Sequence, residues 1–374
     1  MAQLKIGISG GGVGGLAAAI ALRKAGHDVQ VLEQASSFRR VGADINLTPN
    51  VVRALGGFGV VPALKQTAAQ PTHRISRMWD TGAETSRLEM ARAAEAQYGA
   101  PQLTIHRADL LNALRTQLPT EVIRLGCRVD GVETYEDRVK LSFNQGDEET
   151  FDLLVGADGI HSPTRTALFG PEHPQFTGLV SYRSVVDSAK LSVPNMDAFT
   201  KWWGPTPDLQ IVTFPLNRGR ETFVFATTPQ TDWREESWTM PGDVMELRKA
   251  YSAFHPEARA LLEACTEVMK SALYVRDPLP RWSLGHATLL GDACHPMTPF
   301  MAQGAGMAIE DAVVLGRSLE NVSRDGVPEA LARYENARKE RTARVQIGSR
   351  GNEWLREGGN ADWVYGYDAW SAPL

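Results

Sequence analysis

Short apolar runs and one helical stretch alternate at the start of the chain. Residues 4–8 and 29–32 are apolar runs of strand length, and between them lie a glycine cluster and an alanine-rich helical stretch over 16–25. Gly26 follows that stretch, and glycine is the residue type that commonly ends a helix in the left-handed conformation. Strand, glycine turn, helix and strand predict a βαβ unit, which implies a parallel sheet with a right-handed crossover.

Two later apolar runs end in a similar way. Residues 151–155 lead into Asp158, and residues 287–290 lead into Asp292, each with glycine beside the aspartate. Runs of this length are typical of strands that are buried on both faces of an α/β sheet. We therefore expect both strands to belong to the same sheet as the N-terminal βαβ unit.

The middle of the chain has a different pattern. Residues 181–186, 209–214 and 221–226 indicate strands of an antiparallel sheet, and a helical stretch follows around 244–254. Helices are also expected near 307–319 and 327–350. The prediction is an α/β fold: a Rossmann-like nucleotide-binding domain with an inserted, mainly antiparallel β-sheet domain and a C-terminal helix. The expected boundaries are 1–70, 100–175 and 276–374 for the first domain, and 71–99 and 176–275 for the second.

Composition and charge exclude several classes of protein. The 374 residues are 43% hydrophobic and 22% charged, which is ordinary for a globular protein and excludes wholesale disorder. The net charge of −5 does not favour a nucleic-acid-binding protein. The basic stretch 338–341 has an acid within it, so we interpret it as a solvated helix face.

Cysteine usage and hydropathy indicate the compartment. Cys127, Cys265 and Cys294 are too few and too scattered for a disulfide framework or a zinc site, so a reducing cytoplasm is expected. No apolar run is long enough to span a bilayer, and the N-terminal glycines interrupt any signal-like segment. We expect a cytoplasmic protein without membrane or nucleic-acid partners, either a monomer or a homodimer.

The glycine cluster contains the pattern GxGxxG. Gly10 would permit the tight turn, Gly12 would let the backbone approach a pyrophosphate, and Gly15 would allow the helix to pack closely on the strand. Glu33 follows about 20 residues later, where a carboxylate can accept the ribose hydroxyls of an adenosine. An acid at this place favours an unphosphorylated ribose, and hence FAD or NAD.

The rest of the chain resembles a flavoprotein family. The segments Gly291-Asp292-Ala293-Cys294-His295-Pro296 and Gln303-Gly304-Ala305-Gly306 resemble the second FAD fingerprint of the group A aromatic monooxygenases, the p-hydroxybenzoate hydroxylase-like family. Asp158-Gly159 resembles its third fingerprint, and Arg107 matches its arginine near the flavin. Within this family, segments 41–46, 201–203 and 362–368 are similar to salicylate hydroxylase and 6-hydroxynicotinate 3-monooxygenase.

The resemblance implies bound FAD, with NADH or NADPH as a transient reductant. Residues expected at the cofactor are Gly10, Gly12, Val13, Gly14, Gly15, Glu33, Gln34, Arg40, Arg107, Asp158, Gly291, Asp292, Pro299, Gly304, Ala305 and Gly306. For the two aspartates, capping of a helix is an alternative or additional role. Arg107 could instead be a surface cation, and the glycines of 303–306 could serve packing. His295 lacks a companion at ligand spacing, so no metal is expected.

The implied reaction places few demands on side chains. In the family, O2 adds at flavin C4a, and the hydroperoxide transfers OH to an electron-rich ring, so a dry apolar pocket is expected. No catalytic residue is assigned. Pocket candidates, which could also be ordinary core residues, are Asn46, Tyr182, Arg183, Trp202, Val212, Phe214, Phe225, Pro299, Phe300 and Met301, with Arg183 expected to pair with a carboxylate.

Some residues depart from the family pattern. Relatives that act on 6-hydroxynicotinate usually carry histidine where Asn46 and Phe300 stand, and they often have tyrosine near Phe214. Asp44 replaces a usual glycine. These departures weaken any assignment of a general base and allow a different ring.

The sequence therefore predicts an FAD-dependent hydroxylase of a small hydroxylated aromatic or pyridine carboxylic acid, using NAD(P)H and O2, with or without decarboxylation. One alternative is a flavin hydroxylase of a purine-like or secondary-metabolite ring. Another is a flavin-binding protein without turnover. Substrate-stimulated NADH oxidation would distinguish the last alternative.

Overall fold

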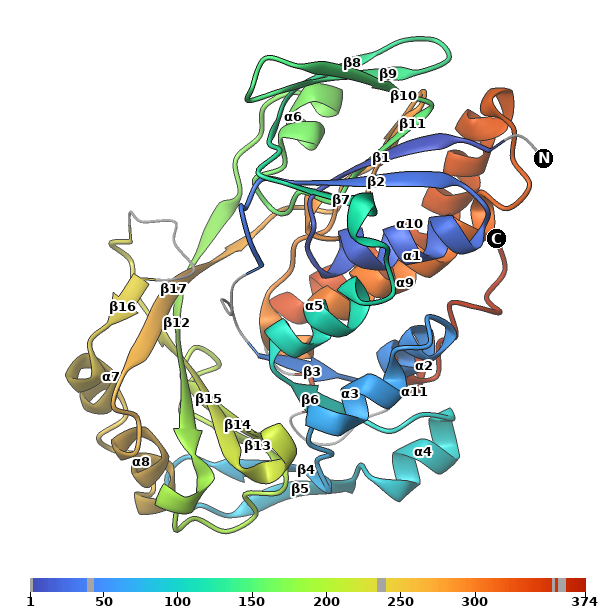
Figure 1. The fold of residues 1–374 in the computed structure, drawn as a ribbon. Helices are drawn as coiled ribbons and strands as arrows, with labels where there is room; N and C mark the ends of the chain where they lie inside the picture. The colour runs from blue at the N-terminus through green and yellow to red at the C-terminus, as the bar shows by residue number, and fades with distance from the viewer. Residues whose placement is uncertain (1–2, 39–43, 234–239, 352–353, 356–360) are drawn as a thin grey trace.

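The computed structural model describes residues 3–38, 44–233, 240–351, 354–355 and 361–374 (Figure 1). A six-stranded sheet in the order β18-β19-β11-β1-β2-β7 forms the first of two large sheets. Its strands are β1 (Lys5–Ser9), β2 (Asp28–Glu33), β7 (Ile123–Leu125), β11 (Leu153–Gly156), β18 (Ser283–Leu284) and β19 (Ala287–Leu289). All neighbouring pairs are parallel except β18 with β19. The parallel α/β sheet predicted from the N-terminal βαβ pattern is thereby confirmed.

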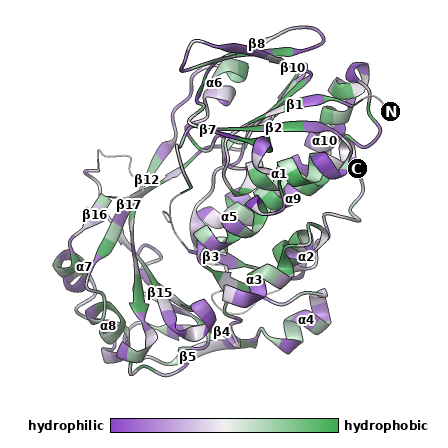
Figure 2. Ribbon diagram, viewed as in Figure 1, coloured by the Kyte–Doolittle hydropathy of each residue, from purple (hydrophilic) through white to green (hydrophobic). Residues whose placement is uncertain are grey.

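Helices pack on this sheet and on one another. They are α1 (Val13–Lys24), α5 (Arg107–Arg115), α6 (Pro163–Phe169), α9 (Gly304–Ser318) and α10 (Val327–Arg350). A Cβ at Gly316 would lie 2.8 Å from the Cβ of Ala21, so α9 crosses α1 at a distance that only small residues permit. Figure 2 shows the hydrophobic character of α1 and α9, whose buried residues join the core of the six-stranded sheet. The helices expected near 307–319 and 327–350 are present.

The second large sheet has eight strands, in the order β16-β17-β12-β15-β14-β13-β4-β5. Its pairs are antiparallel except β13 with β4. The strands are β4 (His73–Met78), β5 (Glu84–Glu89), β12 (Gln175–Asp187), β13 (Phe199–Trp203), β14 (Gln210–Leu216), β15 (Glu221–Pro229), β16 (Met240–Gly242) and β17 (Val268–Val275). Helices α7 (Val244–Ala250) and α8 (Pro256–Glu263) cover the face that lies away from α1 and α9 (Figure 1). The division into two domains at the predicted boundaries stays a prediction.

Smaller elements complete the described chain. Two further sheets pair β3 (Ile45–Leu47) with β6 (Leu103–Ile105), and β8 (Val129–Thr134), β9 (Val139–Phe143) and β10 (Glu148–Phe151) in a hairpin arrangement. The remaining α-helices are α2 (Pro49–Gly57), α3 (Val61–Thr67), α4 (Arg92–Tyr98) and α11 (Asp362–Tyr365). The 3-10 turns are η1 (Thr120–Val122), η2 (Ser188–Lys190), η3 (Asn217–Gly219), η4 (Gly291–Ala293), η5 (Pro299–Met301) and η6 (Arg324–Gly326).

One sequence interpretation is wrong. The stretch 338–341 is not a solvated helix face, because Arg338 is fully buried and Arg341 partly buried. Arg338 pairs with Glu310 and Asp311 of α9, both at 2.8 Å, and Arg341 pairs with Glu310 at 2.9 Å. Arg338 and Arg341 of α10 therefore neutralise buried acids of α9, and these ion pairs stabilise the packing of the two helices.

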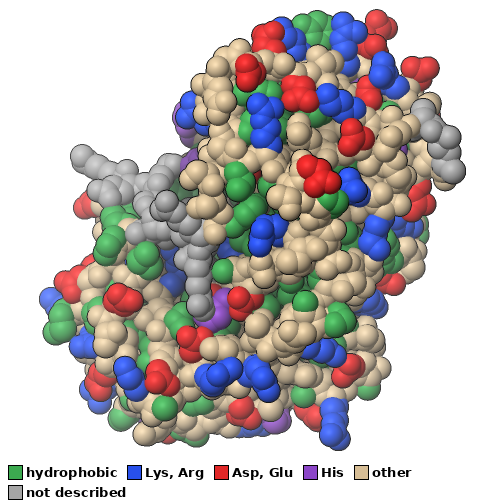
Figure 3. Space-filling model, viewed as in Figure 1, with side chains coloured by type: hydrophobic (Ala, Val, Ile, Leu, Met, Phe, Trp, Pro, Cys, Tyr) green, Lys and Arg blue, Asp and Glu red, His purple; other side chains and the backbone are tan. Residues whose placement is uncertain are grey.

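Charges on the surface are mixed. On the face seen in Figure 3, basic and acidic side chains alternate without a broad area of one sign. This face offers no extended cationic surface of the kind that binds nucleic acid. Among the described residues, no helix combines the length and the apolar character needed to cross a bilayer.

Candidate active site

The carboxyl ends of four parallel strands meet at one edge of the six-stranded sheet. The glycine turn follows β1, Glu33 ends β2, Asp158 follows β11, and Asp292 follows β19. Since β2 and β11 flank β1 on opposite sides, the strand order reverses at β1. In open α/β sheets, ligands bind in the crevice beside such a reversal.

The glycine turn has the geometry of a pyrophosphate cradle. Gly10 has a φ of +103°, which favours glycine, and a Cβ at Gly15 would lie 1.9 Å from the Gly10 carbonyl oxygen. By contrast, a Cβ at Gly12 would meet no protein atom within 4 Å. Gly12 is the N-cap of α1 and offers no side-chain oxygen to the first helical amides. The turn therefore leaves open space beside uncapped amides, which fits an anionic group.

Two backbone amides hold the Glu33 carboxylate beside the glycine turn. Its Oε2 accepts a 2.6 Å hydrogen bond from the amide of Gly11, and its Oε1 accepts one of 2.8 Å from the amide of Ala35. These bonds fix the carboxylate beside the glycine turn. Gln34 is exposed next to it, Val13 and Gly14 begin α1, and Arg40 lies outside the described residues.

Asp292 follows β19 at the edge of the sheet where the carboxyl ends of the parallel strands meet. Its side chain is exposed, yet the protein around it is dense enough that burial raises the pKa of its carboxyl; His295 and Arg107 oppose this shift. Asp292 makes no hydrogen bond with the described part of the chain, so its carboxylate oxygens can accept bonds from a ligand's hydroxyls.

Asp158 is engaged in the fold, unlike Asp292. Its carboxylate accepts hydrogen bonds from the Thr164 amide at 3.0 Å, from the Thr164 hydroxyl at 2.7 Å and from the Ser162 hydroxyl. Burial raises the pKa of Asp158, while Ser162 and Thr164 oppose the rise. The carboxylate therefore helps to fix the start of α6, but the N-cap residue of this helix is Ser162, whose side chain accepts a bond from the amide of Arg165.

A buried arginine joins the Asp158 and Asp292 segments. Arg165 of α6 donates from Nη1 to the carbonyls of Ala293 at 3.3 Å and Cys294 at 3.4 Å. This link between the two predicted fingerprints has no signal in the sequence, since it joins positions that are far apart in the chain.

The segment 303–306 begins α9 and faces α2. The Gln303 side chain is fully buried, donating to the Thr48 hydroxyl at 2.9 Å and accepting from Asn50 at 3.1 Å. A Cβ at Gly306 would lie 2.6 Å from Val51, so this glycine serves packing, whereas one at Gly304 would meet only Met297, at 3.9 Å. No side chain caps α9. Along the chain, the exposed Pro299 precedes Gln303 and Ala305 follows it.

Two arginines lie near one another beside the crevice. Arg107, the first residue of α5, is exposed, and Arg183 of β12 is buried. Burial lowers the pKa of Arg183 to about 10, with a further decrease from Arg107 and an opposing increase from Asp44. Because Arg107 also acts on the carboxyl of Asp292, it is electrostatically coupled to both the crevice and the eight-stranded sheet.

A histidine at the end of β6 links the two-stranded β3–β6 sheet to the eight-stranded sheet, and sequence reasoning did not find this link. His106 contacts Asp44 at 2.9 Å through Nδ1 and Glu221 of β15 at 2.8 Å through Nε2. The Thr104 hydroxyl also donates to the carbonyl of Pro215, at 2.6 Å. These contacts hold the β6 segment and the residue before Arg107 against the eight-stranded sheet.

The pocket candidates on the eight-stranded sheet lie on two different faces. Side chains alternate along strands, so Arg183, Val212, Phe214 and Phe225 share the face that looks toward the six-stranded sheet. Tyr182 and Trp202 point the other way, into the core formed with α7 and α8. The structure therefore does not bring these two residues together with the other candidates.

The pocket candidates outside this sheet lie in different surroundings. Asn46 is buried and accepts a 2.7 Å hydrogen bond from Gln102. Phe300 is buried near the sheet, with its ring centroid 6.0 Å from the Nζ of Lys201. Met301 instead packs in a separate apolar cluster that includes Met90 and Tyr365.

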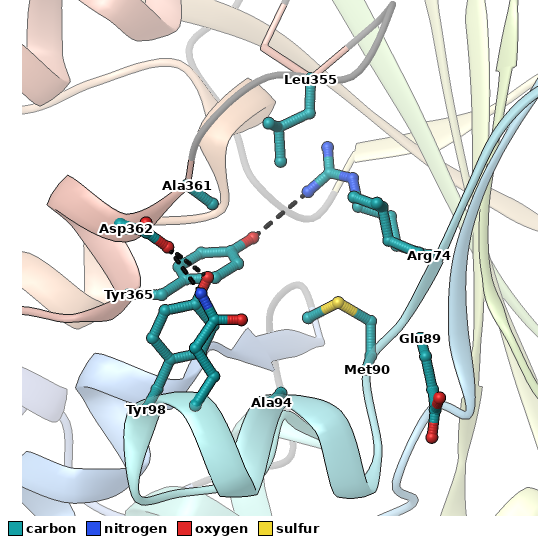
Figure 4. A pocket seen from close by; sticks show the side chains of 11 residues that line it. Arg74, Glu89, Met90, Ala94, Tyr98, Leu355, Ala361, Asp362 and Tyr365 are labelled. Carbon is teal, nitrogen blue, oxygen red and sulfur yellow. Dashed lines mark hydrogen bonds between the residues drawn. The ribbon is translucent and has the colours of Figure 1, made fainter.

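A cavity of about 360 Å³ lies elsewhere, between α4, β5 and the C-terminal segment (Figure 4). Arg74 donates to the hydroxyl of Tyr365 at 3.3 Å, and Asp362 accepts a 2.8 Å bond from the hydroxyl of Tyr98. This cavity is lined by none of the predicted pocket residues.

One buried group among the described residues has the composition of a metal site. Ligand atoms of Cys294, His295 and Asp311 lie within 4.8 Å of one another. However, Asp311 already accepts a 2.6 Å contact from His295 and pairs with Arg338 at 2.8 Å. Burial also raises the pKa of the Cys294 thiol, which disfavours the thiolate that a metal needs. The group is better explained as part of the ionic contact between α9 and α10.

Known proteins resemble this chain over nearly its whole length. The family described as FAD binding domain matches residues 3–348. The chain is 40% identical to a 6-hydroxynicotinate 3-monooxygenase of Bordetella bronchiseptica, with coverage of 99% of this chain and 97% of the relative. A salicylate hydroxylase substrate complex matches with a TM-score of 0.86 and 25% identity, covering 98% and 96% of the two chains. Klebsiella pneumoniae HpxO complexed with FAD and uric acid matches with a TM-score of 0.83 and 25% identity, covering 96% and 90%.

The family supplies the identity of the dinucleotide that fits the crevice. The open space at Gly12, the fixed Glu33 carboxylate and the accessible Asp292 suit the pyrophosphate, ribose and hydroxyl groups of FAD. The predictions of a flavoprotein and of FAD as its cofactor are confirmed. The chain belongs to the FAD-binding domain family and is an FAD-dependent monooxygenase.

Proposed function

We propose that this protein hydroxylates a small hydroxylated aromatic or pyridine carboxylic acid with NAD(P)H and O2, with or without loss of the carboxylate. The observation that carries the proposal is Arg183, a buried cation on the face of the eight-stranded sheet that looks toward the FAD crevice. A guanidinium in this setting suits the bidentate binding of a carboxylate, because its planar fork matches two oxygens. The relative at 40% identity is named for a hydroxypyridine acid, which supports the same class.

The chain's own residues would bind the ring, orient it and exclude water. Bound FAD supplies the activation of O2 and the transfer of one oxygen atom to the ring. Val212, Phe214 and Phe225 give an apolar floor beside Arg183. A floor of this kind keeps water from the reacting atoms and strengthens the pairing of a carboxylate with the guanidinium.

The proposal also assigns roles at the cofactor. Gly12 and the first amides of α1 would hold the pyrophosphate, Glu33 the adenosine ribose, and Asp292 a hydroxyl of the flavin side. Gly304 would leave the start of α9 open toward the isoalloxazine, where the helix dipole favours the negative charge of reduced flavin. Asp158 would act through the position of α6.

A substrate screen tests the proposal. The purified protein should be yellow, and one of a panel of hydroxybenzoates, hydroxypyridine carboxylates and anthranilates should stimulate NAD(P)H oxidation with a matching yield of hydroxylated product. Urate belongs in the panel because a structural neighbour is complexed with uric acid. Stimulation by urate alone would favour the purine-like alternative. No stimulation by any compound would favour a flavin-binding protein without turnover.

The compartment, the oligomeric state and the domain boundaries of the enzyme are also proposed. All three cysteines are free and buried, which suits a reducing compartment. We propose that the enzyme works in the cytoplasm as a monomer or a homodimer, and that residues 71–99 and 176–275 form its substrate domain.

A further inference from the structure

Four residues form a row across the inner face of the eight-stranded sheet. Lys201 of β13 lies opposite Val212 of β14, Val212 lies opposite Phe225 of β15, and Phe225 lies opposite Arg183 of β12. Residues that are directly opposite on neighbouring strands point to the same face. The row thus has a cation at each end and two apolar side chains between them. Three interstrand spacings separate its ends, roughly 14–15 Å between backbones.

Lys201 is buried at the end of the row that lies nearest Phe300. Only 3% of the residue is exposed, and its Nζ lies 3.7 Å from the ring centroid of Trp203 and 6.0 Å from that of Phe300. Phe300 belongs to η5, which precedes the start of α9. The ammonium therefore lies where the sheet faces the segment at the flavin. A lysine so deeply buried carries a desolvation cost that cation–π contacts with two rings offset in part.

The chemistry at this place favours an anionic ring oxygen as the ligand of Lys201. Electrophilic hydroxylation needs an electron-rich ring, and a ring hydroxyl donates most electron density when it is deprotonated. Phe214, on the same face of the sheet as Val212, and Phe300, beside Lys201, cannot take a proton from it. An ammonium in surroundings of low dielectric stabilises the oxyanion without acting as a base.

We propose that Lys201 binds the ring oxygen of the substrate as its anion, while Arg183 binds the carboxylate at the opposite end of the row. This inference rests on the proposed function and adds a specificity-determining residue to it. The row then selects acids whose hydroxyl lies across the ring from the carboxylate, because each anionic group meets its own cation and the ring lies over Val212 and Phe225. A ring that lacks one of the two anionic groups makes one charge-assisted contact fewer, which costs affinity.

The test compares hydroxylated acids with their deoxy analogues on the holoenzyme. Dissociation constants for 4-hydroxybenzoate, benzoate, 6-hydroxynicotinate and nicotinate are measured from the perturbation of the flavin spectrum. The wild type should prefer the hydroxylated member of at least one pair by about tenfold or more. Lys201→Gln should abolish this preference, Lys201→Arg should retain most of it, and Arg183→Gln should weaken both members of a pair equally. Lys190→Gln is the matched control, since Lys190 is exposed.

Several outcomes overturn the assignment. They are equal weakening of both members of a pair in Lys201→Gln, an unchanged preference in that variant, and the lack of any hydroxyl preference in the wild type. A pH series adds a readout that a purely structural role would not move: the wild type should bind the hydroxylated acid as its ring anion down to a lower pH than Lys201→Gln does. Failure of the proposed function has a different signature, which is a retained hydroxyl preference without hydroxylated product.

Discussion

Replacement of Asp292 by alanine isolates the contribution of one carboxylate to FAD binding. Asp292 is exposed in the crevice and makes no hydrogen bond with the described residues, so its loss leaves no protein group without a partner. The variant should therefore fold normally. Its apoprotein should lose one hydrogen bond from a cofactor hydroxyl to a charged acceptor, worth about 1.5–3 kcal/mol. The Kd for FAD should rise by about 10- to 150-fold.

The assay is a fluorescence titration of the apoprotein with FAD, followed across a pH series. Burial raises the pKa of Asp292, so the carboxyl takes up a proton at a higher pH than an ordinary aspartate. A protonated carboxyl accepts hydrogen bonds more weakly, so FAD affinity should fall on acidification of the wild type. Asp292→Asn, which cannot titrate, should lack this decrease.

Two further variants serve as controls for Asp292. Asp325→Ala removes an exposed aspartate remote from the crevice and should leave the Kd for FAD unchanged. Asp158→Ala removes the acceptor at the start of α6 and should lower stability by about 0.5–2 kcal/mol. A Kd within twofold of wild type for a folded Asp292→Ala protein would refute the assignment of this carboxylate to the cofactor.

Three other changes have distinct expected results. Gly12→Ala should leave the melting temperature of the apoprotein nearly unchanged but reduce bound flavin in the absorbance spectrum, because its Cβ meets no protein atom within 4 Å; equal loss of both would contradict the cradle. Arg183→Ala should raise the KM for a carboxylate substrate by about 10-fold or more and leave that for NADH unchanged, and equal effects would argue against the anchor. Arg338→Met should lower the free energy of unfolding in urea by about 3–5 kcal/mol, because two buried acids lose a partner. Burial alone would raise the pKa of Glu310 and Asp311, but the cations around them hold both values below the ordinary range, so this stabilisation should fade as the pH falls through the lowered values. A variant as stable as wild type at neutral pH would contradict it.

Local features of the site could be predicted from the sequence. The turn at Gly10 and the carboxylate of Glu33 depend on neighbours within one βαβ unit, so their spacing alone encodes the geometry. The ends of β11 and β19 could also be placed, because each apolar run is followed by a glycine within two residues of an aspartate. One boundary differed: Phe151 belongs to β10, and Asp152 separates it from β11 through a 2.8 Å bond to the amide of Lys5.

Features set by distant contacts could not be predicted. Tyr182 and Arg183 are adjacent and both buried, and only the packing of α7 and α8 decides which of them faces the crevice. Asp158 and Asp292 look alike in the sequence, yet Ser162 and Thr164 engage only the first. Arg338 looked solvated because its acidic partners lie on another helix.

The place of β19 in the parallel sheet has a consequence during synthesis on the ribosome. β11 pairs with β1 on one side and with β19 on the other, and β19 emerges long after β1 and β11. Until then, β11 has an open edge of unpaired backbone groups, of the kind that invites association between nascent chains. Chains that stop before residue 287 should therefore aggregate rather than accumulate as folded fragments. A chaperone that shields this edge would act after β11 has emerged and before β19 does.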